Sequence, residues 1–173
     1  MTAQPLTDSA LDRFNALTVD EVRAALTACC ASTSWVSRVA AGRPYATRTA
    51  LLDTAAATCR QLSDADLEEA LAAHPRIGDR AGGTSAEARW SRQEQASVSD
   101  SDDATRAALR EANTAYEERF GRVFLIRAAG RSPAEMLAEA RRRLGNDDAT
   151  ERDETARQLG QIARLRVERL LEA

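Results

Sequence analysis

The sequence contains no lysine, so all 24 of its basic residues are arginine. This absence excludes mechanisms that need a Schiff-base lysine or the lysine of a P-loop. Histidine is nearly absent as well, since His74 is the only one, and the three cysteines (Cys29, Cys30, Cys59) show no Cys-x-x-Cys spacing. The sequence therefore offers no histidine and cysteine cluster for a metal ion.

Long apolar runs and basic runs are also missing. Nowhere do roughly eighteen apolar residues follow one another, and the first residues lack the basic start and apolar core of a signal peptide. Basic and acidic residues are interspersed and give a net charge of −3, with no basic stripe for nucleic acid. We therefore expect a cytoplasmic protein that binds neither membranes nor nucleic acids, and the odd number of cysteines fits a reducing compartment.

Apart from these absences, the composition is that of an ordinary globular protein. Apolar residues make up 43% and charged residues 29% of the 173 residues, but aromatic residues only 4%. The length predicts one compact domain over residues 1–173, with residues 1–8 flexible. Because aromatic residues are scarce, the core must consist mainly of Ala, Leu, Val and Ile.

The apolar residues recur at spacings of three and four along the whole chain, which predicts an all-α fold. Capping signals support this prediction: Thr18 with Glu21, Ser63 with Asp66, and Ser132 before a proline. We predict helices over about 9–17, 18–29, 35–41, 47–62, 64–72, 85–98, 104–119, 133–144 and 150–171. Residues 76–84 are predicted as a loop, and residues 120–126 as a buried extended segment.

His74 lies between the end of a predicted helix and Pro75. Since proline biases the preceding residue toward an extended backbone, this loop is suited to presenting a side chain to a pocket. Any imidazole chemistry near neutral pH must use His74. The alternative is that a single histidine in a glycine-bearing loop is structural or merely exposed.

Two polar features accompany the histidine. Ser91, Glu94 and Gln95 lie at positions i, i+3 and i+4, so they share one helical face, which is either functional or simply solvated. Arg166 is set in an apolar stripe between Ile162 and Leu170. It either pairs with a buried carboxylate, extends its charge to the surface, or binds an anionic substrate.

These features, in this order, resemble the 2-oxo-4-hydroxy-4-carboxy-5-ureidoimidazoline (OHCU) decarboxylases. The resemblance extends from about residue 11 to residue 171. It rests on His74-Pro75-Arg76-Ile77-Gly78, on Ser91-Arg92-Gln93-Glu94-Gln95, on Phe120-Gly121 with Phe124-Leu125-Ile126, and on Cys29, Trp35, Arg43-Pro44, Leu144-Gly145-Asn146-Asp147, Glu154, Ile162 and Leu165-Arg166-Val167. The sequence departs from the family pattern at Val123, where proline is common, and at Ala96-Ser97.

The resemblance implies an all-helical enzyme that forms (S)-allantoin, uses no metal or organic cofactor, and assembles as a homodimer. It implies that His74 is the catalytic acid or base and that Arg166 lies in the pocket. The implied substrate contacts are Pro75, Ser91, Arg92, Gln93, Gln95, Phe124, Leu125, Ile126, Arg127 and Ala128.

The substrate chemistry is compatible with these residue types. A C=N bond next to the carboxylate-bearing carbon accepts the electron pair that carbon dioxide leaves behind, so no external electron sink is required. In our hypothesis, His74 transfers the proton and Arg166 attracts the anion. Glu94 either controls the charge of the imidazole or shares the proton with it. The rival hypothesis is a non-catalytic helical ligand-binding or interaction domain.

Overall fold

The computed structural model describes residues 8–79 and 82–173, and within these ranges it contains helices and no strand. The all-α prediction is therefore confirmed. The helices are α1 (Ser9–Ala16), α2 (Val19–Cys29), α3 (Thr33–Ala41), α4 (Arg48–Arg60), α5 (Asp64–Ala72), α6 (Ala86–Glu94), α7 (Ala96–Ser99), α8 (Asp103–Phe120), α9 (Pro133–Arg143) and α10 (Asp148–Glu172).

Side-chain caps fix several of the helix starts. At α2, the Thr18 hydroxyl accepts a hydrogen bond from the Glu21 amide at 3.3 Å, and the Glu21 carboxylate accepts one from the Thr18 amide at 2.8 Å. The same reciprocal arrangement begins α5 and α9. Each box satisfies backbone donors that the first turn of a helix leaves without partners. The predicted starts of these three helices are confirmed.

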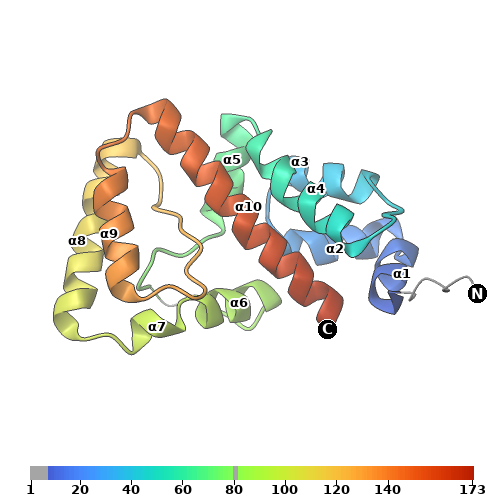
Figure 1. The fold of residues 1–173 in the computed structure, drawn as a ribbon, viewed down its shortest axis with the longest axis horizontal. Coiled ribbons are helices and arrows are strands. Elements are labelled where there is room, and N and C mark those ends of the chain that lie inside the picture. The colour runs from blue at the N-terminus through green and yellow to red at the C-terminus, as the bar shows by residue number, and fades with distance from the viewer. Residues whose placement is uncertain (1–7, 80–81) are drawn as a thin grey trace, which may run out of the picture.

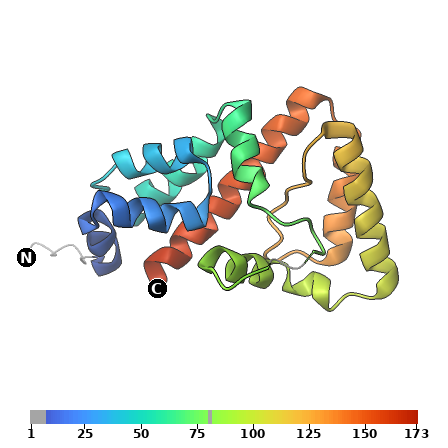
Figure 2. The ribbon, with the colours of Figure 1, turned by 180° about the vertical axis from the view of Figure 1, so that it is seen from behind.

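The long helix α10 crosses the molecule between two groups of helices (Figures 1 and 2). Helices α1 to α5 lie on one side of α10. Helices α8 and α9 lie on the other side, toward the N-terminal end of α10. Gly160 permits the close approach of α10 to α4, because a Cβ at this position would lie 2.7 Å from the Ala56 carbonyl oxygen.

Two apolar cores correspond to these two groups. The first lies between α1–α5 and α10 and contains Trp35, whose Nε1 donates to the Ala55 carbonyl at 2.8 Å. The second lies around α8 and α9 and contains Tyr116 and Met136. The segment 122–128 follows the end of α8 at Gly121, which has a left-handed φ of 67°. Because this segment contributes side chains to both cores, it lies at their junction.

Three predictions need correction. The helix expected over 85–98 is interrupted at Gln95, where α6 ends and the Gln95 side chain accepts a hydrogen bond from the Gly78 amide at 2.9 Å. Phe120 belongs to α8, although the rest of the predicted buried segment is indeed neither helix nor strand. Asp8, which was predicted to be flexible, caps α1 and forms an ion pair with Arg48. The other residues of that prediction, 1–7, lie outside the described residues.

None of the helices in the described ranges is both long enough and apolar enough to cross a membrane.

Candidate active site

His74 follows the last turn of α5, and the backbone of that helix orients its ring. The His74 amide donates to the Leu71 carbonyl at 2.9 Å, and ring Nδ1 lies 2.9 Å from the Ala70 carbonyl oxygen. A carbonyl can only accept, so Nδ1 carries the proton and Nε2 of the neutral ring has a free lone pair. Nε2 is buried and has no hydrogen-bond partner in residues 8–79 and 82–173.

The surroundings of His74 keep its imidazole neutral at physiological pH. Burial of the ring, reinforced by the positive charge of Arg166, lowers the pKa of His74 from 6.5 to about 4, although the bond to Ala70 acts in the opposite direction. No hydrogen bond joins His74 to Glu94 in the described structure. The idea that Glu94 controls the charge of the ring or shares its proton thus gains no support from this geometry.

Arg166, on α10, is 1% exposed and forms a two-pronged ion pair with Glu94, at the end of α6. Its Nε lies 3.1 Å from Glu94 Oε1, and its Nη2 lies 3.0 Å from Glu94 Oε2 and 3.0 Å from Ser91 Oγ. Arg169, one turn further along α10, donates to Glu94 Oε1 at 3.1 Å. Planar guanidinium groups match a carboxylate in this manner, and the pairing fixes both side chains.

The charges of this cluster do not cancel. Two guanidinium groups surround one carboxylate, which leaves a net positive charge at the cluster. Hydrogen bonds to the described residues occupy Nε and Nη2 of Arg166 but not Nη1. The guanidinium therefore retains donors that can bind an anionic ligand.

Together these groups line a small cavity of about 20 Å³ at the junction of the two cores. It brings together side chains that lie far apart in the sequence, from the α5 end, α6, the segment 122–128 and α10. The lining residues are His74, Pro75, Ile77, Ser91, Glu94, Gln95, Phe124, Leu125, Ile126, Ala128, Ile162 and Arg166. In the described part of the chain, no cluster of three or more His, Cys, Asp or Glu side chains has an arrangement that could hold a metal ion.

Comparison with known proteins gives the family. The model of the OHCU decarboxylase family matches residues 15–168. The chain belongs to the OHCU decarboxylase family.

Individual relatives agree with this assignment. The uric acid degradation bifunctional protein TTL of Arabidopsis thaliana is 30% identical over 145 residues, which is 82% of this chain, but the chain spans only 45% of the length of that relative. A crystal structure of an OHCU decarboxylase in the presence of (S)-allantoin is similar, with a TM-score of 0.72 and 28% identity over 85% of this chain and 96% of the other. A crystal structure of (S)-allantoin synthase has a TM-score of 0.66 over 94% of this chain and 53% of that one, and at 18% identity this likeness concerns the fold alone.

Most residues that the OHCU decarboxylase resemblance implied reach the cavity, but three do not line it. Arg92 and Gln93 are exposed on α6, and Arg92 donates to the Gly83 carbonyl at 2.9 Å. Arg127 is half-buried, and its backbone amide donates a hydrogen bond to the Gln158 side chain. All three belong to segments that pass the cavity, but helical and extended periodicity turn their side chains elsewhere.

Sequence reasoning also missed residues at the cavity. Ile77 and Ile162 line it, and Arg169 completes the ion-pair cluster. The position of Arg169, three residues after Arg166, was a usable signal because residues at this spacing are neighbours on a helix surface. The isoleucines gave no comparable signal, since they resemble any other core residue.

Proposed function

We propose that this chain catalyses the cofactor-independent decarboxylation of OHCU to (S)-allantoin in urate breakdown. The observation that carries the proposal is the meeting of His74, Glu94 and Arg166 at one cavity in a member of the OHCU decarboxylase family. Two relatives support it, one named for uric acid degradation and one crystallised in the presence of (S)-allantoin.

The reaction needs little beyond positioning and proton transfer. When the bond between the ring carbon and the carboxylate breaks, carbon dioxide leaves, the electron pair moves into the neighbouring C=N unit, and the nitrogen of that unit takes up a proton from the solvent. The resulting enol-like intermediate loses its hydroxyl proton and gains a proton on the adjacent carbon, which gives allantoin. The protein must hold the ring, move these protons and confine protonation to one face.

In our proposal, His74 acts as the base. Its free Nε2 accepts the hydroxyl proton of the intermediate, and the protonated ring then supplies a proton to the carbon on the face that it touches. Arg166 attracts the anionic substrate through the unpaired charge of the ion-pair cluster. Glu94 orients the Arg166 guanidinium, while Ser91, Gln95, Pro75 and the segment 124–128 contact the ring and the ureido group.

We further propose that residues 1–173 form one domain, that the protein is a cytoplasmic homodimer, and that it works without metal or organic cofactor. The three cysteines are free and buried, as a reducing compartment allows. The dimer is supported by the family resemblance, and sedimentation equilibrium of the purified chain tests it.

The test of the function is the turnover of freshly generated OHCU. Because this compound also decays spontaneously, the rate and the optical activity of the product are compared with those of an enzyme-free reaction. We expect a large rate enhancement and (S)-allantoin as the single enantiomer. Tight binding of (S)-allantoin without any acceleration would instead establish the rival function, a non-catalytic ligand-binding domain.

A further inference from the structure

One buried face of α10 is unusually polar. Glu151, Thr155, Gln158, Ile162 and Arg166 follow one another at spacings of three and four, so they form one continuous stripe. All five are buried, and four of them carry polar or charged groups. Burying such groups is costly unless each is hydrogen-bonded, and an apolar stripe would pack as well. The stripe therefore calls for an explanation beyond stability.

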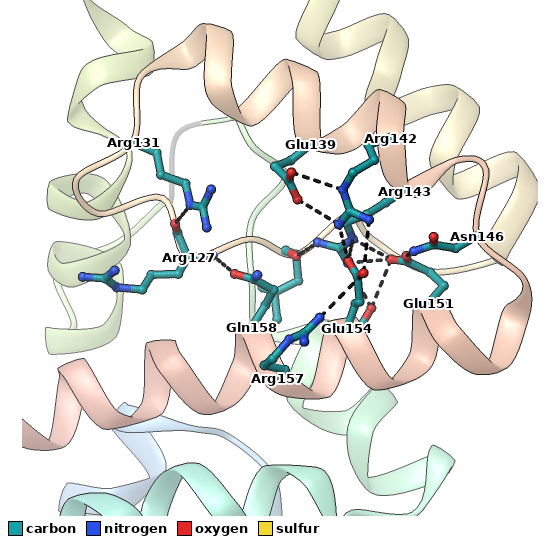
Figure 3. Close-up of polar contacts among 12 residues, drawn as sticks. Arg127, Arg131, Glu139, Arg142, Arg143, Asn146, Glu151, Glu154, Arg157 and Gln158 are labelled. Atoms are coloured by element: carbon teal, nitrogen blue, oxygen red, sulfur yellow. Dashed lines mark hydrogen bonds and ion pairs between the residues drawn. The ribbon is translucent and has the colours of Figure 1, made fainter.

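Gln158 of this stripe and Arg143 of α9 hold the backbone of the segment that lines the cavity. Residues 122–128 form neither helix nor strand, so their backbone groups depend on other partners. The Leu125 carbonyl accepts a hydrogen bond from Arg143 Nη1 at 2.7 Å, and the Arg127 amide donates to Gln158 Oε1 at 2.9 Å. Figure 3 shows the interaction between Arg127 and Gln158 and the polar contacts around Arg143.

Arg143 is itself fixed from several sides. This fully buried guanidinium donates to Glu151 Oε1 through Nε at 2.9 Å and through Nη2 at 2.5 Å, and to Thr155 Oγ1 at 3.2 Å. Asn146 donates to the other carboxylate oxygen of Glu151 at 2.9 Å, and the Tyr116 hydroxyl also contacts Glu151. The donor that reaches Leu125 is thus held in one position.

The pattern of burial shows which way the segment faces. Leu125 packs in the first core, whereas Phe124, Ile126 and Ala128 pack in the second, an alternation that indicates an extended backbone. In an extended chain, the N–H and C=O groups of successive residues point to opposite sides, so those of residues 125 and 127 point to the same side. With the Leu125 carbonyl bound to Arg143 and the Arg127 amide bound to Gln158, the Ile126 amide points to the opposite side, and this amide has no hydrogen bond to the described residues.

We propose that Gln158 and Arg143 are positioning residues, which hold the segment so that the Ile126 N–H points into the cavity and donates to a carbonyl oxygen of the bound ring or its ureido group. This inference rests on the proposed function. Gln158 lies two turns before Arg166 on the same face, about 12 Å along the axis, so α10 sets the distance between this donor and the guanidinium that attracts the anion.

The experiment compares wild type with three variants. Gln158→Met keeps the side-chain length but removes the acceptor, and Gln158→Glu provides an acceptor oxygen again. Gln161→Met is the control, because it makes the same substitution at an exposed position of α10. For Gln158→Met we expect a fall in kcat/KM of about 10- to 100-fold, together with a lower excess of (S)-allantoin after correction for spontaneous decay. Gln158→Glu should recover most of the rate, and Gln161→Met should behave as wild type.

The optical purity separates positioning from simple destabilisation, because a smaller folded fraction lowers the rate but leaves the product enantiomer unchanged. If Gln158→Met fails to fold, Gln158→Asn retracts the acceptor by one methylene while keeping the amide, and the same losses are expected. A folded Gln158→Met or Gln158→Asn variant with wild-type kcat/KM and pure (S)-allantoin overturns the proposal.

A second measurement does not depend on turnover. In a ¹⁵N-labelled wild-type protein titrated with (S)-allantoin, the Ile126 amide resonance should shift, and this shift should be lost in Gln158→Met. An unchanged Ile126 amide at a saturating concentration overturns the positioning role even if the enzyme is active. Conversely, a shift at Ile126 without any decarboxylation keeps the positioning role and contradicts only the proposed function.

Discussion

At the scale of single residues, the proposed chemistry depends on the neutral state of His74. The ring of this cavity-lining residue lies with Nδ1 against the Ala70 carbonyl, its Nε2 is buried without a hydrogen-bond partner in the described residues, and burial lowers its pKa to about 4. We expect kcat/KM to stay constant from pH 7 to about pH 5 and to fall tenfold per pH unit below about pH 4, where the base becomes protonated. A pH–rate profile measures this, and a fall centred near pH 6.5 would contradict the neutral, buried ring.

The same pKa shift makes His74 a source of pH-dependent stability. Unfolding raises the pKa from about 4 to about 6.5, so the unfolded state binds more protons between these values. The free energy of unfolding therefore keeps the full contribution of His74 above pH 6.5. As the pH falls from 6.5 to 4, it decreases by up to about 3 kcal/mol. Urea unfolding of wild type and His74→Asn at several pH values tests this, because the difference between the two proteins should shrink over this window. A constant difference contradicts it.

The ion pair between Arg166 and Glu94 should matter for both folding and activity. We expect Arg166→Met and Glu94→Gln each to lower the free energy of unfolding by about 2–4 kcal/mol and kcat/KM by at least about 100-fold. Because the two side chains are in contact, the double variant should lose less than the sum. Arg164→Met is the matched control on α10, since its pair with Asp53 is exposed and should contribute less than about 1 kcal/mol. Strict additivity of the two buried changes would argue against the pair.

At the scale of elements, local sequence signals predicted where helices begin but not where tertiary contacts interrupt them. The pairs Thr18 with Glu21 and Ser63 with Asp66 cap helices as expected, because a capping box involves only one turn of backbone. The break at Gln95 was not predictable in this way, since its partner, the Gly78 amide, lies 17 positions earlier in the chain.

The contact between α10 and α4 leads to a prediction at this scale. An alanine in a helix is usually more favourable than a glycine by about 1 kcal/mol, but a Cβ at Gly160 would lie 2.7 Å from the Ala56 carbonyl oxygen. We therefore expect Gly160→Ala to destabilise the protein by about 1–3 kcal/mol. Gly82→Ala is the control, because its Cβ would meet nothing within 4 Å. Thermal unfolding measures both, and equal melting temperatures for the two variants would disprove the close contact.

At the scale of the whole molecule, the candidate site is a product of long-range convergence. Residue type and spacing singled out His74, Ser91, Glu94 and Arg166, the resemblance implied that they belong to one site, and the fold places them around one cavity. The sequence could not reveal that Glu94 binds Arg166 and Arg169 rather than His74, because such a pairing depends on how α6 meets α10. Nor could it assign Gln158 to the segment 122–128, since no local pattern links a helix side chain to a distant backbone amide.

The most direct test of the proposed enzyme is a side-by-side assay of wild type and His74→Asn with fresh OHCU, following carbon dioxide release and the optical rotation of the allantoin. We expect wild type to yield (S)-allantoin well above the spontaneous rate, and His74→Asn to be slower by about 10²- to 10⁴-fold, the usual contribution of a positioned acid or base. Equal rates with equally pure (S)-allantoin from both proteins would contradict the role of the imidazole at the centre of this site.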